Sequence, residues 1–221
     1  MALAKFPPLY PILDAAFLPR EIALRHETLA KLVASLAEAG VEILQYRNKT
    51  ASEAEILRDA EAIRSSAPPR LTIILNDYVH LVRRAGFHGV HLGQTDLPPR
   101  EARRLLGAES LIGLSTHGES QLRAAALEPV DYVAIGPVFA TVSKANPDPV
   151  VGLDGVRLAR RLTNLPVVAI GGITRDNASA VRDAGADSIA VISAIFSADV
   201  DAAKAAAAVL GFFERVQPGF H

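Results

Sequence analysis

The stretches that decide the fold are AEAGVEILQY at residues 37–46, RRAGFHGVHL at 83–92 and RDAGADSIAV at 182–191. In each of them, Ala-Gly stands between a segment of helical composition and a short apolar run. Glycine is common just after the end of a helix, because it adopts the left-handed backbone conformation at little cost. The repeat therefore predicts three helix-to-strand junctions, in which the helices are capped by Gly40, Gly86 and Gly185.

Outward from these junctions, strand-like and helix-like segments alternate along the whole chain. The apolar runs that fit strands are Leu9 to Asp14, Val41 to Tyr46, Leu71 to Leu75, Gly89 to Leu92, Leu111 to Leu114, Asp131 to Ile135, Pro166 to Ile170 and Asp187 to Ile192. Most are continuously hydrophobic, which is typical of parallel strands covered on both faces. We predict an α/β protein, a single (β/α)8 TIM barrel with eight parallel strands. The alternative is an open doubly wound sheet, but no G-x-G-x-x-G follows the first strand.

The length of 221 residues, half of them apolar, favours one domain over residues 1–221. One connection is unusual, because GPVFATVSKANPDPVVGL at 136–153, after the sixth predicted strand, is too long and too rich in Pro and Gly for a tight turn. Connections of this length in compact domains are usually functional. We expect a functional loop there, with closure over the site as a hypothesis.

Charge and composition exclude several classes of function. Lys and Arg total 23 against 24 Asp and Glu, so no net positive field favours nucleic acid or an anionic membrane. The absence of Cys excludes disulfides and thiol chemistry. No secretory signal and no run of about 18 apolar residues is found, so we expect a soluble cytoplasmic protein that acts on small molecules. The sequence leaves open whether it forms a homo-oligomer.

Polar side chains follow the predicted strands, and the C-terminal ends of barrel strands carry the active site in this fold. After the second strand, Gln45, Arg47 and Lys49 share the two-residue period of an extended chain, so all three point to one side. Two cations on one side predict an anion site. Taken alone, Arg47 and Lys49 could equally be ordinary solvated charges.

Two carboxylates follow neighbouring strands and could approach one ion. They are Asp77, after the third strand, and Asp96, after the fourth. Oxygen ligands from two carboxylates, completed by phosphate and water, suit Mg²⁺. Each Asp alone is better explained as a helix cap. Together, beside a cationic cluster, they predict a metal site.

A second anion site is predicted after the seventh and eighth strands, the usual phosphate region of such barrels. Gly171 and Gly172, followed by Thr174, would expose backbone N–H groups at the start of a helix, and Ser193 follows the last strand. The alternative is that these glycines only allow a tight turn.

The histidines carry less information. His88 and His91 should project to opposite faces of an extended strand, so they cannot chelate one metal. His117, at the end of the fifth strand, is a candidate for the wall of the site, and a hydrogen-bonded structural histidine is an equally good interpretation. No Ser-His-Asp arrangement can be recognised in the sequence, so the sequence does not support a hydrolase.

Seven segments resemble, in order and spacing, those of the thiamine-phosphate synthases: LQYRNK, IILND, GVHLGQTD, GLSTH, YVAIGPVFATVSK, VVAIGGIT and AGADSIAVISAIF. The resemblance runs from Leu9 to Phe196 and implies the same TIM barrel. It also implies that 4-amino-2-methyl-5-(diphosphooxymethyl)pyrimidine is condensed with 4-methyl-5-(2-phosphoethyl)thiazole, or its 2-carboxy form. The products would be thiamine phosphate and pyrophosphate, and the cofactor would be Mg²⁺.

The resemblance carries roles to individual residues. The pyrimidine diphosphate would be held by Gln45, Arg47, Lys49, Asn76, Ser115 and Lys144. The thiazole phosphate would be held by Thr141, Ser143, Gly172, Ile192 and Ser193. Asp77 and Asp96 would ligate Mg²⁺, and the catalytic set would be Arg47, Lys49, Ser115 and Lys144. Asn48 stands where an acidic residue is usual and Ser143 where Thr is common, and neither change removes a charge assigned to catalysis.

Two other functions compete with this interpretation. A thiazole tautomerase-like isomerase has a similar sequence pattern but uses neither diphosphate nor Mg²⁺, so the presence of Lys49, Asp77 and Asp96 favours the synthase. A non-catalytic barrel that binds a phosphorylated ligand would not need two carboxylates for a metal.

Overall fold

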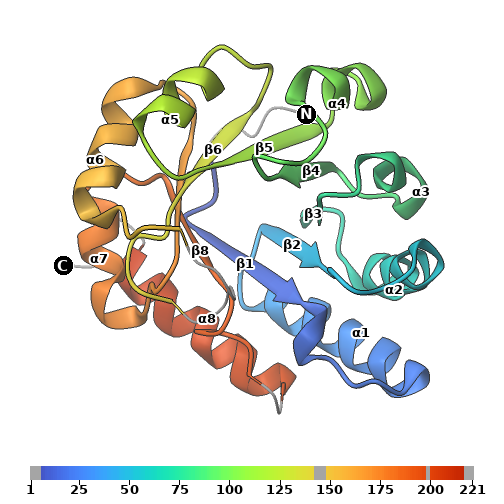
Figure 1. The fold of residues 1–221 in the computed structure, drawn as a ribbon. Coiled ribbons are helices and arrows are strands. Elements are labelled where there is room, and N and C mark those ends of the chain that lie inside the picture. The colour runs from blue at the N-terminus through green and yellow to red at the C-terminus, as the bar shows by residue number, and fades with distance from the viewer. Residues whose placement is uncertain (1–5, 142–147, 198–199, 217–221) are drawn as a thin grey trace.

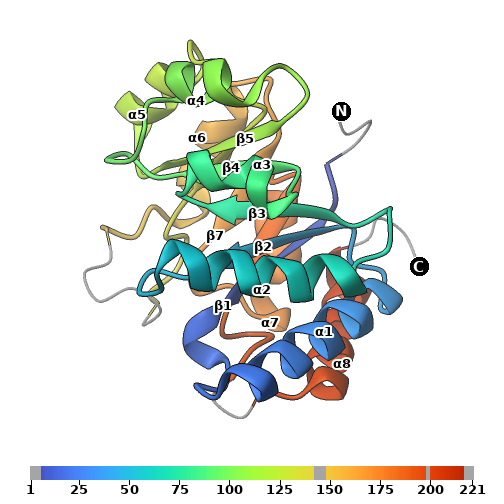
Figure 2. The ribbon, with the colours of Figure 1, turned by 90° about the vertical axis from the view of Figure 1, so that its right-hand side faces the viewer.

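The computed structural model describes residues 6–141, 148–197 and 200–216, and it confirms the predicted barrel. Its parallel strands close in sequence order, with β1 beside β8 (Figure 1). The strands are β1 (Leu9–Asp14), β2 (Ile43–Arg47), β3 (Thr72–Asn76), β4 (Gly89–Leu92), β5 (Leu111–Thr116), β6 (Tyr132–Ile135), β7 (Val167–Ile170) and β8 (Ser188–Val191). Figure 2 shows the barrel from the side, with the described ends of the loop after β6 projecting at the C-terminal ends of the strands.

The helices surround the strands as an outer ring (Figure 1). They are η1 (Ala15–Phe17), α1 (Ile22–Glu38), α2 (Glu53–Ser66), η2 (Val79–Leu81), α3 (Val82–Ala85), α4 (Pro99–Leu106), α5 (Glu119–Ala125), α6 (Gly152–Leu162), α7 (Arg175–Asp183) and α8 (Ala202–Val216). The expected glycine caps are confirmed, since Gly40, Gly86 and Gly185 have φ values of 97°, 68° and 107°. None of the described helices combines the length and apolar character needed to cross a membrane.

Two layers of apolar side chains explain why the strands read as continuous hydrophobic runs. Alternate residues of each strand face the helices, such as Leu13 and Leu44, while the others, such as Ile12 and Ile43, fill the barrel interior. Full burial of one such side chain contributes about 1.5–3 kcal/mol. Both faces of each strand are therefore apolar, and the hydrophobic runs in the sequence show no alternation with polar residues.

The barrel interior is filled partly by aromatic rings. Tyr10 and Tyr132 are both nearly inaccessible, at 1% and 0% exposure, and their ring centroids lie 5.9 Å apart. Room for the Tyr132 ring depends on Gly113, the neighbour in register on β5, because a Cβ at that position would lie 2.0 Å from Tyr132 Cζ. The inner layer thus holds two phenol groups directly below the C-terminal mouth.

At the rim formed by the N-terminal ends of the strands, the same kind of ion pair occurs twice. Arg103 on α4 donates to Asp131 at 2.6 Å, and the same carboxylate accepts the Ile112 backbone N–H of β5. Arg160 on α6 donates to Asp187 at 2.7 Å, and that carboxylate accepts the Val167 N–H of β7 at 2.8 Å. Each of these two ion pairs therefore ties a helix to the start of a strand.

Candidate active site

The end of β2 lies beside the end of β1, and the two strands place a cation against a carboxylate. Arg47 pairs in register with Asp14, and its Nη1 donates to the Asp14 carboxylate. The side chains are 25% and 11% exposed, respectively, so the pair lies at the edge of the mouth. Sequence reasoning missed Asp14, although it is the last residue of the first predicted strand. Its apolar strand neighbours hid the signal.

Lys49 follows β2 in a turn that is held by Asn48. The buried Asn48 side chain accepts from the N–H groups of Thr50 and Ala51 at 3.3 and 3.2 Å, and it donates to the Tyr46 hydroxyl at 3.1 Å. An amide can accept and donate at once, which a carboxylate cannot. Asn48 therefore organises the turn that presents Lys49.

Asp77 and Asp96 come together at the mouth, and Lys49 joins them. The Lys49 ammonium donates to the Asp77 carboxylate. Burial raises the pKa of Asp77, Lys49 opposes that shift, and the neighbouring Asp96 carboxylate raises the pKa further. Two like charges and one cation thus share a partly desolvated space. That arrangement disfavours a second negative charge until another cation is present.

The backbone at Asp77 is strained in a way that aims its side chain. Its φ of 67° is the only positive value outside glycine among the described residues. Asp tolerates this region better than most residues, but at a cost of about 1–3 kcal/mol. The turn is held because the Asp77 N–H donates to the His91 carbonyl at 2.9 Å. Strain of this kind collects at functional sites.

Neither carboxylate caps a helix, which was the alternative interpretation. The residues at the N-caps of η2 and α4 are Tyr78 and Pro98, without side-chain hydrogen bonds. Asp96 instead accepts the Gly93 N–H at 2.6 Å within the loop after β4. Both groups therefore remain available to a ligand at the mouth.

Asn76, the last residue of β3, carries an unpartnered donor. Its side chain is 7% exposed, and Nδ2 is buried without a hydrogen-bond partner among the described residues. A buried donor left unpaired costs about 1–3 kcal/mol. Such a group next to Asp77 is well placed to donate to a bound substrate.

Gln45 and Ser115 lie on inner positions of β2 and β5 and face the barrel axis. Gln45 is 1% exposed and donates to the Tyr10 hydroxyl at 3.1 Å. Ser115 Oγ lies 2.8 Å from His91 Nε2. His91 is therefore a mouth residue that sequence reasoning examined only as a metal ligand, and nothing local in GVHL indicated its partner on β5.

Two other histidines, His88 and His117, have partners in the backbone. His88 Nδ1 accepts the Ile73 N–H at 2.9 Å, whereas His91 contacts Tyr132 and Ser115, so the two rings have different partners. His117 Nδ1 lies 2.7 Å from the Gly136 carbonyl and donates to it. His117 thus braces the start of the loop after β6.

The loops after β6 and β7 contact each other at the predicted phosphate region. Gly171 and Gly172 have φ values of 101° and 64°, and Thr174 is the N-cap of α7. A Cβ on Gly172 would lie 2.5 Å from the Ala140 carbonyl oxygen, which puts Thr141 close to this turn. The expected loop 136–153 is described except at 142–147, so Ser143 and Lys144 lie outside the described residues.

The turn after β8 adds Ile192 and Ser193 to the same end of the barrel. The Ile192 carbonyl accepts the N–H groups of Ile195 and Phe196 at 3.1 and 3.0 Å, and Ser193 is exposed. Binding of phosphate by these residues stays a prediction.

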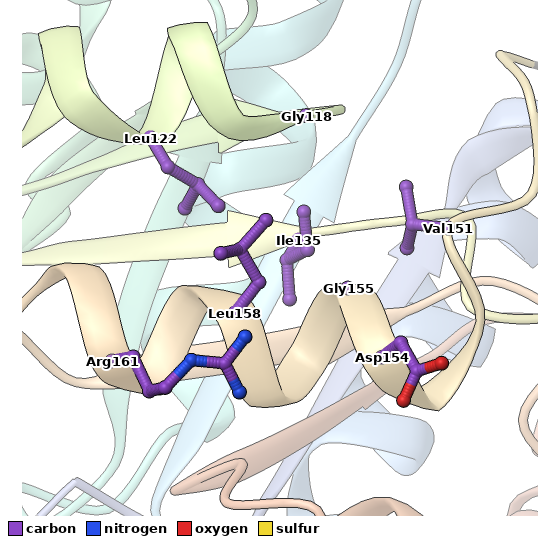
Figure 3. A pocket seen from close by; sticks show the side chains of 8 residues that line it. All are labelled: Gly118, Leu122, Ile135, Val151, Asp154, Gly155, Leu158 and Arg161. Carbon is purple, nitrogen blue, oxygen red and sulfur yellow. The ribbon is translucent and has the colours of Figure 1, made fainter.

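A hollow in the described part of the chain lies away from this mouth. A cavity of about 330 Å³ between α5 and α6 is lined by Leu122, Ile135 and Leu158, with Asp154 and Arg161 at its ends on α6 (Figure 3). None of the predicted site residues lines it. Its centre is apolar and offers no group for proton or phosphate chemistry, so it is a gap in helix packing and the mouth remains the candidate site.

A closed parallel barrel whose C-terminal mouth carries cations, carboxylates and an amide donor unpaired among the described residues is typical of a TIM-barrel enzyme. The sequence pattern of the family described as thiamine monophosphate synthase matches residues 9–195. The chain belongs to this family, as its motifs predicted.

Individual relatives agree with this assignment. The thiamine-phosphate synthase of Koribacter versatilis is 53% identical over 189 residues, which cover 86% of this chain and 89% of the relative. That of Agrobacterium fabrum is 43% identical over 77% of this chain and 80% of its own. Among solved structures, the thiamine phosphate pyrophosphorylase of Pyrococcus furiosus superposes with a TM-score of 0.78 at 28% identity, covering 95% of both chains.

Proposed function

We propose that the enzyme condenses 4-amino-2-methyl-5-(diphosphooxymethyl)pyrimidine with 4-methyl-5-(2-phosphoethyl)thiazole, or its 2-carboxy form, at the C-terminal mouth. The observation that carries the proposal is the cluster of Lys49, Asp77 and Asp96 beside Arg47. A mouth that only bound a monophosphate would need cations but not two converging carboxylates.

The donor set at the mouth fits Mg²⁺. Among the described residues no group of three or more His, Asp or Glu could hold a metal, so the protein would contribute Asp77 and Asp96 alone. Mg²⁺ commonly binds through one or two carboxylates, substrate phosphates and water. When bound, it would supply positive charge that stabilises a departing diphosphate.

The residues of the chain would act on the diphosphate by position and charge. Arg47 and Lys49 would bind its oxygens once the substrate competes for them with Asp14 and Asp77. The buried Asn76 amide would donate its unpartnered hydrogen, and Ser115 would donate its hydroxyl. Preorganised donors of this kind stabilise charge that develops as a bond breaks.

In the proposed reaction, the bond between the pyrimidine methylene carbon and the diphosphate oxygen breaks, and its electron pair leaves with pyrophosphate. The thiazole nitrogen then donates its lone pair to the resulting carbocation, which forms the new C–N bond of thiamine phosphate. No protein nucleophile is required. Thr141, Gly172, Ile192 and Ser193 would hold the thiazole phosphate, and Ser143 and Lys144 keep the roles that the resemblance implies.

The test is an assay with both substrates, with and without Mg²⁺, that measures thiamine phosphate and released pyrophosphate. We expect equal amounts of the two products, and loss of both without Mg²⁺ and in Asp96→Ala. Asp154→Ala, on α6 with a 94% exposed side chain, is the matched control. Isomerisation of the thiazole by Asp96→Ala without metal would favour the tautomerase alternative, and binding without turnover would favour a non-catalytic barrel.

A further inference from the structure

A continuous chain of hydrogen bonds crosses the barrel interior and joins two mouth residues that lie on different strands. Gln45 Nε2 donates to Tyr10 Oη at 3.1 Å, and Tyr10 Oη lies 2.9 Å from Tyr132 Oη. Tyr132 Oη lies 3.0 Å from His91 Nδ1, and His91 Nε2 lies 2.8 Å from Ser115 Oγ. The first four of these side chains are at most 9% exposed, so the chain is shielded from water up to its end at Ser115.

The Gln45 amide determines the direction of the chain. Gln45 donates to Tyr10, and Tyr132 is the other partner of the Tyr10 hydroxyl among the described residues. The order that pairs every buried hydrogen therefore has Tyr10 donating to Tyr132 and Tyr132 donating to His91 Nδ1. A neutral imidazole that accepts at Nδ1 carries its hydrogen on Nε2. Its Nε2–H therefore donates to Ser115 Oγ.

The opposite direction leaves the mouth with the wrong chemistry for an anion. It requires the Gln45 amide to turn over so that its oxygen accepts from Tyr10, and the hydrogens of Ser115, His91, Tyr132 and Tyr10 then all point away from Ser115 and towards Gln45. Ser115 would donate to His91 and offer only lone pairs to a ligand. A diphosphate oxygen is an acceptor and cannot pair with lone pairs.

We infer that Tyr132 and His91 are positioning residues that orient the Ser115 hydroxyl as a donor to the diphosphate. The inference rests on the proposed function for the identity of the anion. Tyr132 fixes the His91 tautomer, His91 occupies one lone pair of Ser115 Oγ, and the Ser115 hydrogen is left to point into the mouth. The ring of Tyr132 also stacks on His91, with centroids 5.6 Å apart, which limits rotation of the imidazole.

The first test reads the tautomer directly. The full-length enzyme is prepared with nitrogen-labelled histidine, and His91→Gln identifies the His91 signals in the NMR spectrum. We expect a protonated Nε2 and an unprotonated Nδ1 in the wild-type protein. Tyr132→Phe, which removes the donor to Nδ1, should shift the Nδ1 signal or mix the tautomers. A protonated Nδ1 in the wild type would overturn the inference, whatever reaction the enzyme performs.

The second test asks whether Tyr132 acts through Ser115. We expect Tyr132→Phe and Ser115→Ala each to lower kcat/KM for the pyrimidine diphosphate by roughly tenfold, the size of one hydrogen bond to a charged group. Tyr132→Phe should then cause no further loss when added to Ser115→Ala. Tyr46→Phe alters a tyrosine outside this hydrogen-bond chain. It should change kcat/KM by the same factor in the wild-type and Ser115→Ala proteins.

An equal loss from Tyr132→Phe with and without Ser115 would overturn the inference. Tyr10→Phe provides a second variant in case Tyr132→Phe folds poorly, and it should lower kcat/KM less, because Tyr132 can still donate to His91. If the wild-type enzyme makes no thiamine phosphate, the proposed function fails, while the tautomer measurement still decides the direction of the chain.

Discussion

At the N-terminal rim of the barrel, Asp131 and Asp187 are each paired with a guanidinium and a backbone N–H. At the C-terminal mouth, by contrast, two carboxylates lie close to each other. Asp131 and Asp187 each accept from an arginine and from a backbone N–H near the start of a strand. Asp77 instead lies near Asp96 on a strained backbone, beside an amide donor that has no partner in the described part of the chain.

The difference separates stabilisation from function in one architecture. Polar groups at the N-terminal rim are satisfied by the protein, so their removal should destabilise the fold. Polar groups at the mouth are incompletely satisfied by the protein, so they are free to bind a ligand and should stabilise the fold little. In TIM barrels the catalytic groups lie at the C-terminal face and the opposite face serves stability.

The largest expected effect is the loss of activity in Lys49→Ala. Lys49 is 48% exposed on its side chain, so its removal should change the free energy of unfolding little. If it stabilises the leaving diphosphate, kcat should fall by roughly 10²–10³-fold, as when one preorganised donor is removed from other active sites. Steady-state kinetics and urea unfolding measure the two quantities on the same preparation.

Lys31→Ala is the control, because Lys31 is a 66% exposed lysine on α1 in an ion pair with Glu27. It should leave both kcat and stability unchanged. A Lys49→Ala enzyme with normal kcat, or one that is unstable, would contradict the division between mouth and rim.

The next effect is on stability, and we expect it at the other end of the barrel. Arg103 donates to the carbonyls of Gly107, Ser110 and Pro129 as well as to Asp131. Because the pair is partly exposed, Arg103→Ala should lower the free energy of unfolding by about 2–3 kcal/mol, less than a fully buried pair would lose. The kcat of the folded enzyme should be unchanged, and a change in kcat larger than the change in stability would refute this assignment.

A third prediction concerns pH and the buried His91. Burial lowers the pKa of His91 to about 4, with Asp96 opposing and Lys49 adding to the shift. The unfolded chain takes up a proton near the ordinary pKa of about 6.5, so the unfolded state binds more protons between these values and stability falls as pH falls through that window. From pH 7 to pH 5 this group should cost about 2 kcal/mol.

Urea unfolding of the wild type and of His91→Gln at both pH values isolates that contribution. His91→Gln should lose correspondingly less stability on acidification. Equal pH dependence in the two proteins would show that His91 is not held neutral in the folded enzyme.

The barrel was predicted well because apolar runs and helix-ending glycines can each be recognised from a short stretch of sequence. The predicted run from Leu9 to Asp14 coincides with β1, and the Ala-Gly junctions end helices at Gly40 and Gly86 as expected. The start of β2 was predicted at Val41 and lies at Ile43, because apolar burial begins before strand pairing does.

The candidate site was predicted in part. Strand-end position brought Lys49, Asp77 and Asp96 together, since parallel strands end on one face. The partnership of Tyr10 with Tyr132, 122 residues apart, had no local signal. Both tyrosines stand in apolar runs, and only closure of the barrel brings their hydroxyl groups into contact. Asp14 was hidden for the same reason, because its partner Arg47 depends on the register between strands.

The smallest expected effect is on stability. Replacing an aspartate with asparagine should stabilise the protein slightly at the mouth, in Asp77→Asn, and destabilise it at the N-terminal rim, in Asp131→Asn. The folded chain holds the Asp77 proton more tightly than the unfolded chain does, because burial and Asp96 raise its pKa, so ionisation above that pKa lowers stability. Asn keeps the shape, tolerates the left-handed backbone and carries no charge. In metal-free buffer at neutral pH, Asp77→Asn should therefore unfold at a slightly higher urea concentration, and the gain should shrink as the pH falls towards the ordinary carboxyl pKa.

Asp131→Asn removes a paired charge and should unfold at a lower urea concentration. A loss of stability in Asp77→Asn that matches the loss in Asp131→Asn would mean that the Lys49 contact outweighs the crowding of carboxylates, and that the mouth is stabilised in the same way as the N-terminal rim.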